Sequence, residues 1–327
     1  MRYYKLKSVV AVILILAILT VIAGCTDHKT QDETPLDVIL NETAQLLLEN
    51  AASPVCGSVN GDWVAFGLSR WGGEVPQDWF DSYYEAVESH VQACDGVLHE
   101  RKYTEYSRLV LALTAIGKDP KNVSGYNLLL PLANFEKTVF QGTNGAIFAL
   151  LALDSGNYAI PEIASEGTQA TREMYVDCIL SKELPDGGWS LGGGEAEVDL
   201  TAMALQALAK YKDRQDVAEA IEKGLNILST QQNENGGYTA YQVESSESIS
   251  QTIVALSELG ISLDDSRFVK NGNSLLDALL RFRQEDGGFS HLLDGKTDPL
   301  ATEQAFYALV AADRVAKGSN SLYNMQG

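Results

Sequence analysis

The chain has 327 residues, of which 45% are hydrophobic, and its 44 acidic and 24 basic side chains give a formal charge of −20 at pH 7. This excess of carboxylates argues against a nucleic-acid-binding protein, because phosphate recognition depends on clustered Lys and Arg. It also disfavours electrostatic binding to anionic lipids, so any attachment to a membrane needs an apolar anchor. Length and hydrophobic content suffice for a large core.

The amino terminus has the features of an export signal. Three basic residues precede an apolar run over 9–23, which leads through Gly24 into Cys25. The segment 22–25, Ile-Ala-Gly-Cys, resembles the lipobox of bacterial lipoproteins. This resemblance implies cleavage after a signal peptide of residues 1–24 and acylation of Cys25, for example with palmitate. An uncleaved transmembrane anchor is the alternative.

The mature protein is therefore expected to lie on the extracytoplasmic face of the membrane, where the lipid on Cys25 is its membrane contact. Residues 25–35 would form a flexible tether, residues 36–318 one domain, and residues 319–327 a C-terminal tail. Removal of the signal peptide takes away three basic and no acidic residues, which changes the formal charge from −20 to −23.

The domain is predicted to be all-α, with six helical hairpins. The second helix of each hairpin is rich in Ala and apolar nearly all round, so it must be buried, whereas the first helix has a charged face. A closed ring with the second helices inside achieves this burial, while an open solenoid would leave one apolar layer in contact with water. First helices are expected over 37–49, 79–92, 128–140, 168–183, 216–231 and 274–284, and second helices over 63–68, 106–116, 144–153, 200–211, 249–260 and 301–315.

Similar turns occur in the last three hairpins. The segments 186–189, 235–238 and 286–289 each place two glycines before an aromatic residue, at spacings of 49 and 51 residues. A period of this size indicates stacked supersecondary units. We expect the paired glycines to supply positive φ angles and the aromatic side chain to pack over the turn.

The second of these turns carries a family resemblance. Residues 223–238 resemble the Gln-Trp repeat of squalene and oxidosqualene cyclases, with Tyr238 in place of Trp, and residues 280–289 are a looser copy. The resemblance implies the α/α toroid of terpene cyclases and protein prenyltransferases, which is related to the cobalamin-binding toroid of intrinsic factor and transcobalamin. It also matches secreted bacterial proteins with such repeats.

Asp199 is the most specific candidate for chemistry. Residues 197–202, Glu-Val-Asp-Leu-Thr-Ala, resemble the Asp-x-Asp-Asp-Thr-Ala motif of squalene-hopene cyclases, in which the middle Asp protonates an alkene. Leu200 replaces the third carboxylate, and Glu197 lengthens the first. The alternatives are a helix N-cap, which would favour the charged carboxylate, and a ligand contact in the cavity.

A ring of polar residues is expected around Asp199. If all second helices run the same way, their amino ends meet at one rim. That rim would bring together a set of candidate ligand-binding residues, namely Glu105, Asn144, Glu197, Asp199, Tyr241, Glu247, His291 and Glu303. Unrelated helix caps remain an alternative, and glycoside hydrolysis by a carboxylate pair is a more distant one.

Cysteine and histidine give little sign of a metal site. Cys56, Cys94 and Cys178 form no C-x-x-C pair and have no neighbouring His at ligand spacing, so zinc and zinc-dependent prenyl transfer are not indicated. We expect buried thiols, although a Cys56–Cys94 disulfide stays open. No cofactor is expected.

Together these features predict a lipoprotein whose toroid cavity binds a small molecule that is apolar, isoprenoid-like or corrinoid-like. A cyclase that uses Asp199 as its general acid and a non-catalytic adhesion or scaffold protein are the alternatives.

Overall fold

The computed structural model describes residues 34–163, 166–240 and 243–326. From Leu36 onward these residues belong to one compact unit. Cys25 and the predicted signal peptide lie outside the described residues, and so does Tyr241. No helix within the described ranges is long and apolar enough to cross a membrane.

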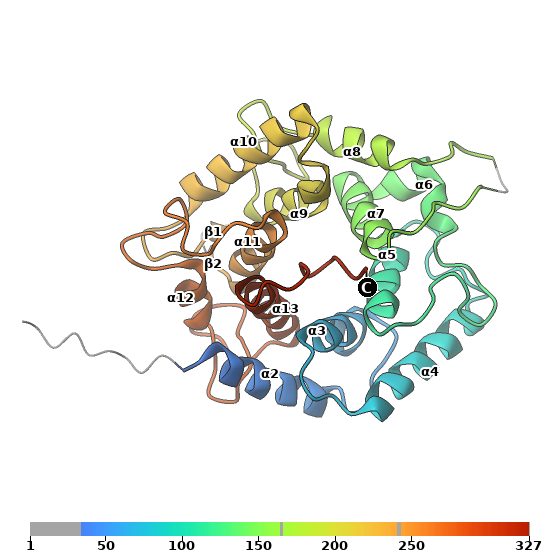
Figure 1. The fold of residues 1–327 in the computed structure, drawn as a ribbon, viewed down its shortest axis with the longest axis horizontal. Coiled ribbons are helices and arrows are strands. Elements are labelled where there is room, and N and C mark those ends of the chain that lie inside the picture. Colours follow the sequence, from blue (N-terminus) through green and yellow to red (C-terminus); the bar gives the residue numbers. More distant parts are fainter. Residues whose placement is uncertain (1–33, 164–165, 241–242, 327) are drawn as a thin grey trace, which may run out of the picture. The chain divides into compact units, whose positions relative to one another are not determined.

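The unit consists of two concentric layers of helices (Figure 1). Each inner helix contacts the next one along the chain, and α13 contacts α3, so the inner layer closes into a ring as predicted. The outer layer contains α2 (Leu36–Asn50), α4 (Gln77–Ala93), α6 (Phe135–Thr138), α8 (Arg172–Leu180), α10 (Gln215–Gln231) and α12 (Leu275–Leu280). The inner layer contains α3 (Trp63–Trp71), α5 (Thr104–Ala115), α7 (Thr143–Ser155), α9 (Val198–Leu208), α11 (Ser246–Leu259) and α13 (Pro299–Ala316).

The sequence patterns of the two layers explain their positions. In α13 every residue from Ala301 to Asp313 except Gln304 is buried, as a helix with neighbours on all sides requires. The outer helix α10 buries only a stripe with helical spacing, from Val217 to Leu228, and keeps its charged face in water. Small side chains in the inner helices let them approach closely around the centre.

One predicted outer helix is interrupted. The expected helix over 128–140 consists of the 3-10 turns Pro131–Ala133 and Val139–Gln141 on either side of the short α6. Pro131 has no backbone N–H to donate, and the Asn134 side chain accepts a hydrogen bond from the Lys137 N–H, which starts a new helix. The continuous helix was therefore a wrong prediction.

The glycine turns also differ from the prediction. Gly187 and Gly188 both have positive φ, but in the other two turns only the first glycine does. The second glycine is needed for close packing instead, since a Cβ at Gly237 would overlap the Glu244 carboxylate. The aromatic residues after the turns are fully buried, as expected. After Tyr238, the strands β1 (Thr239–Ala240) and β2 (Val243–Glu244) pair antiparallel, with Thr239 opposite Glu244.

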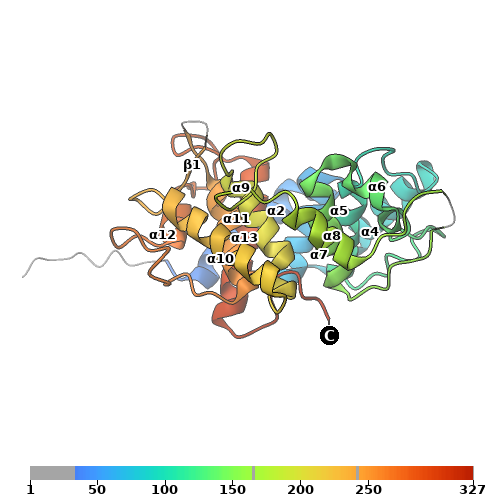
Figure 2. The same ribbon diagram turned by 90° about the horizontal axis from the view of Figure 1, so that it is seen from above.

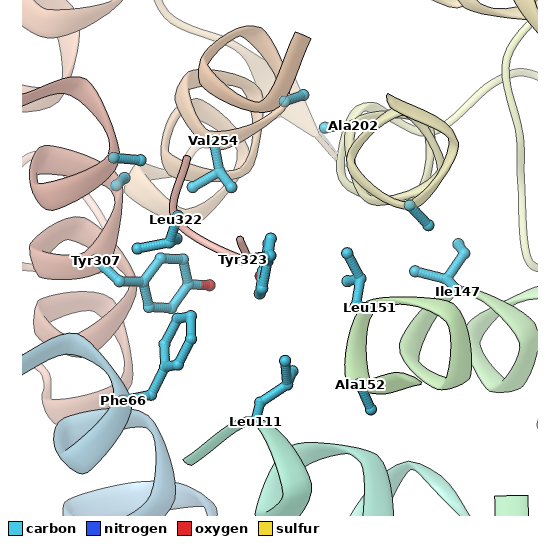
Figure 3. Close-up of a cluster of buried hydrophobic side chains, with 14 of the residues drawn as sticks. Phe66, Leu111, Ile147, Leu151, Ala152, Ala202, Val254, Tyr307, Leu322 and Tyr323 are labelled. Atoms are coloured by element: carbon cyan, nitrogen blue, oxygen red, sulfur yellow. The ribbon is translucent and has the colours of Figure 1, made fainter. Parts of the chain in front are cut away.

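Two residues of the C-terminal tail, Leu322 and Tyr323, are buried at the centre of the inner ring. Leu322 is completely buried, and Tyr323 stacks on Phe66 with ring centroids 5.5 Å apart (Figure 3). The Arg70 guanidinium donates hydrogen bonds to the backbone carbonyls of residues 321, 322 and 324. Glu258 accepts from the Tyr323 N–H at 3.0 Å and from a tail hydroxyl. The tail fills space that the small inner side chains leave open, so it belongs to the core.

The three cysteines of the body are free thiols. We expected these thiols to be buried. Cys56, Cys94 and Cys178 are instead half-buried. Burial raises the pKa of Cys56 to about 12, so this thiol stays protonated at neutral pH.

Candidate functional site

The amino ends of five inner helices meet at one cavity of about 370 Å³, which we call the mouth. It lies at the end of the ring from which the β1 hairpin projects, away from the C-terminus of the chain (Figure 2). Its lining combines the apolar or aromatic side chains of Trp63, Phe148, Met203 and Tyr307 with polar groups that can form hydrogen bonds. The lining residues are Trp63, Phe148, Asp199, Met203, Ser245, Glu247, Gln251, His291, Gln304 and Tyr307.

Helical spacing arranges this lining in layers. Residues four positions apart lie on the same face of a helix, so Asp199 stands above Met203 on α9 and Glu247 stands above Gln251 on α11. The upper layer therefore carries carboxylates, and the lower layer carries longer neutral side chains.

Hydrogen bonds in the lower layer join the three neighbouring inner helices α9, α11 and α13. Gln251 Nε2 donates to the Tyr307 hydroxyl at 2.6 Å and to Gln304 Oε1 at 2.8 Å. Gln206 Nε2 in turn donates to Gln251 Oε1 at 3.0 Å. The ring of Trp63 lies 5.7 Å from that of Tyr307, which adds an aromatic wall. These contacts fix a polar floor above the apolar centre seen in Figure 3.

In the upper layer, the His291 imidazole contacts the Glu247 carboxylate. His291 Nδ1 lies 2.9 and 2.8 Å from the two carboxylate oxygens of Glu247. The His291 carbonyl accepts a hydrogen bond from the Ser246 N–H at 3.3 Å, so the loop before α13 is attached to the first turn of α11. This contact holds the imidazole over the carboxylate.

Asp199 does not act as a helix cap. Glu197 occupies the N-cap position of α9 and forms no side-chain hydrogen bond to the helix, while Asp199 is the second helical residue. The cap alternative is therefore wrong. Asp199 Oδ1 is buried without a hydrogen-bond partner among the residues that the structure describes. Burial raises the pKa of Asp199, the Ser248 hydroxyl acts in the opposite direction, and the charge of Glu197 raises it further.

Two more acceptor oxygens near the mouth have no hydrogen-bond partner in the described part of the chain. They are Asn144 Oδ1 on α7, one turn above Phe148, and Glu303 Oε2 on α13, one turn above Tyr307. Buried polar atoms are normally hydrogen-bonded, so an unpaired one needs an explanation. Of the three oxygens, Asp199 Oδ1 belongs to the lining of the mouth, whereas Asn144 and Glu303 lie one turn above lining residues.

Glu303 is the most deeply buried acid of this group, with a relative exposure of 1%. Its Oε1 accepts a hydrogen bond from the Asn60 N–H at 2.6 Å. Burial raises the pKa of Glu303 to about 7, and the nearby charges of Asp62 and Asp298 act in the same direction. Burial also raises the pKa of Tyr307 well above its usual range, with contributions from the Glu303, Asp199 and Glu247 carboxylates. All three acids therefore lie close to the Tyr307 hydroxyl.

The other predicted site residues have structural partners away from the cavity lining. Glu105 pairs with Arg108, which also contacts the buried Asp62 at 2.7 Å. Glu197 accepts from the Ser190 hydroxyl at 3.2 Å and braces the loop before α9. Tyr241 lies outside the described residues.

Sequence reasoning missed the floor of the mouth. Gln251, Gln304 and Tyr307 carry no motif, and Trp63 is not among the predicted site residues. A signal for two of them does exist, since Gln251 and Tyr307 each lie four residues after an acid that was predicted at the rim.

The described residues do not fit a catalytic zinc site. No group of three or more His, Cys, Asp or Glu side chains in that part of the chain is placed to hold a metal ion.

Comparison with known families agrees with this architecture. The model of the prenyltransferase alpha-alpha toroid domain matches residues 133–244 and 202–319, which together span more than half of the chain. The chain therefore belongs to this family. No curated protein matches its sequence.

Solved structures show the same fold at low sequence identity. Unsaturated glucuronyl hydrolase from Bacillus sp. GL1, which is responsible for the degradation of glycosaminoglycan, is 14% identical with a TM-score of 0.55; the alignment covers 88% of this chain and 98% of that one. A protein from Actinoplanes is 11% identical with a TM-score of 0.53, over 86% of this chain and 100% of that one. The α/α toroid is thus shared with a glycosyl hydrolase as well as with prenyltransferases, and the fold by itself does not choose between them.

Proposed function

We propose that the mouth binds a small polar molecule rich in hydrogen-bond donors, such as an amine or a polyhydroxylated compound. The observation that carries this proposal is Asp199 Oδ1, a buried acceptor of the lining that has no partner among the described residues; Asn144 and Glu303 hold two more such oxygens one turn above lining residues. An unpaired buried acceptor costs about 1–3 kcal/mol, so a ligand that donates to several of them gains affinity from groups already in place.

The lining favours such a ligand over the isoprenoid-like or corrinoid-like molecules that the family resemblance suggests. Hydrocarbon would leave the carboxylates and amides of the mouth without partners, at a cost for each group. The volume of about 370 Å³ is also near the lower end of the range of about 300–1,000 Å³ for ligand pockets, which suits a compact ligand better than a macrocycle.

The binding site would face the cell exterior. The segment 22–25 and the apolar run before it support a lipid anchor on Cys25, followed by a tether to the toroid. The excess of acidic residues favours a cationic ligand over an anionic one. A pure scaffold role is less well supported, because the tail fills the centre of the ring but leaves the mouth open.

Acid–base catalysis at the same mouth is a second candidate. It is favoured by two carboxyl groups in unlike environments, since Asp199 has a raised pKa whereas Glu247 pairs with His291. A neutral Asp199 would donate a proton to a hydroxylated or unsaturated substrate, and the Glu247–His291 pair would accept one. Cyclisation of a squalene-like substrate with Asp199 as the acid remains a variant of this candidate.

The binding proposal is tested by native mass spectrometry of the protein from Thr26 onward after exposure to a cell extract, followed by calorimetry with candidate amines and sugars. We expect a retained polar ligand whose affinity falls about tenfold or more in Asp199→Asn, because one acceptor in the mouth becomes a donor. Glu219→Gln, on the outer face of α10, is the matched control. Retention of an isoprenoid, or equal affinity in both variants, would contradict the proposal.

The catalytic candidate is tested by incubating the same protein with squalene-like substrates and with glycosides that carry an unsaturated sugar. Turnover that Asp199→Asn abolishes, while the variant still folds and binds, would establish an enzyme. Unchanged substrates alongside measurable binding would leave a binding protein.

A further inference from the structure

Exposed apolar side chains are concentrated on the face that carries the mouth. Among the described residues, eight of the ten large hydrophobic side chains that are exposed lie in the loops that lead into the inner helices or in the first turn of α13. Every one of the six inner helices is preceded by at least one of them. They are Val55, Val59, Val97, Phe140, Leu191, Val243, Leu293 and Leu300.

Two of these side chains are more than half exposed. Leu191 is 63% exposed, and Phe140 is 57% exposed although the Arg101 guanidinium lies over its ring, 4.3 Å from the centroid. Apolar side chains that gather on one face of a soluble domain mark an interaction surface. The six loops surround a cavity of about 370 Å³, so a ligand that fits inside the mouth would leave most of these side chains in water.

The mouth provides an acidic centre for this surface. Asp199 and Glu247 line it, Asp199 Oδ1 has no partner among the described residues, and Glu303, 1% exposed, holds a second such oxygen one turn above the lining residue Tyr307. Protein interfaces often place one anchor side chain in a desolvated central pocket, with surrounding contacts that exclude water. Acceptor oxygens at the centre and apolar groups around them call for a partner with the complementary pattern.

We infer that this face docks a polypeptide segment of a partner protein, which inserts a Lys or Arg side chain into the mouth and covers the loops with apolar side chains. The inference rests on the proposed function, because the same acceptors receive the basic group. Arg has five N–H donors and Lys has three, so either side chain can donate to Asp199 Oδ1 and still reach a second acceptor of the lining.

Charge disfavours two other occupants. A second copy of the chain would bring together two bodies that each carry a formal charge of −20, with acidic mouths facing each other. Anionic lipid headgroups would meet the same repulsion. A basic segment instead gains attraction at long range and apolar contact at short range.

The test uses the full-length protein purified in detergent and three probes. The first is a nonapeptide with one central Arg between apolar residues, and the second is the same peptide with citrulline in place of Arg. The third is N-acetylargininamide, which presents the side chain alone. Binding is measured by calorimetry for the wild type, for Asp199→Asn, for the double variant Leu191→Ser and Leu293→Ser, and for the matched control Val38→Ser on the outer helix α2.

We expect the Arg peptide to bind about tenfold or more tightly than either other probe, since apolar loops and charged centre both contribute. Asp199→Asn should weaken both Arg probes. The double loop variant should weaken only the peptide, and Val38→Ser should change nothing.

Three outcomes would contradict the inference, and they are distinguishable. If N-acetylargininamide binds as tightly as the peptide, or if the loop variant binds the peptide normally, the docking inference is wrong and the proposed ligand site stands. If neither Arg probe binds, while sugars bind to the mouth, the basic partner is excluded. Competition by zwitterionic vesicles with the peptide would assign the face to a membrane and overturn the inference.

Discussion

Replacement of Glu303 by Gln should stabilise this protein in a pH-dependent way. The pKa of Glu303 is about 7 in the fold, against 4.5 for an ordinary Glu, and burial is the main cause. Below pH 4.5 the carboxyl is neutral in the folded and unfolded chains, so its ionisation costs nothing. Between pH 4.5 and about 7 the unfolded chain loses its proton first, and stability falls; above pH 7 the loss is constant.

The size of the effect follows from these two values. Each pH unit between them is worth about 1.4 kcal/mol, so the buried carboxylate costs about 3 kcal/mol at pH 8. Glu303→Gln keeps an oxygen that can accept the Asn60 N–H and removes the ionisation. We expect equal stability of the two proteins near pH 4.5 and a gain of about 3 kcal/mol for the variant at pH 8, which corresponds to several degrees in Tm.

The assay is thermal and urea unfolding of both proteins at half-unit steps from pH 4.5 to pH 8.5. The contributions of other titrating groups to the free energy of unfolding cancel in the difference between wild type and variant. Glu219→Gln, an exposed change on α10, should give a difference close to zero at every pH. A Glu303→Gln difference that does not vary with pH, or that rises around pH 4.5 alone, would show that Glu303 is not a buried acid with a raised pKa.

Three further changes test other parts of the molecule. Cys25→Ala should abolish fatty-acid labelling and membrane retention of a mature-sized protein, and labelling that survives would refute the lipid anchor. Tyr323→Ala removes a buried ring that stacks on Phe66 and should cost about 3–5 kcal/mol in urea unfolding, whereas an unchanged midpoint would mean that the tail is not part of the core. Gly237→Val should lower Tm because its side chain would overlap the Glu244 carboxylate; an unchanged Tm would argue against close packing there.

The sequence alone identified the architecture because two local patterns repeat. Ala-rich helices without a polar face alternate with amphipathic ones such as α10, and this alternation requires an inner and an outer layer. The recurrence of paired glycines before an aromatic residue shows the repeat length of about 50 residues. For helices with a clear pattern of this kind, such as α10 and α13, the predicted ends lie within a few residues of the observed ends.

Local chemistry limited other predictions. The helix over 128–140 failed because Pro131 and the Asn134 cap outweigh helix propensity there. The role of the second glycine in a turn such as Gly237 depends on a residue across the turn, Glu244, so no local rule predicts it.

For the mouth, the sequence by itself determined which residues stand at the amino ends of the inner helices, and Asp199, Glu247 and His291 do line one cavity. Only the tertiary structure decided what those residues can do. Closure of the ring withdraws Asp199 and Glu303 from water and leaves acceptor oxygens without partners, because desolvation depends on elements far apart in the chain. It also places the tail residue Tyr323 in the centre, since only the assembled ring has a space for it.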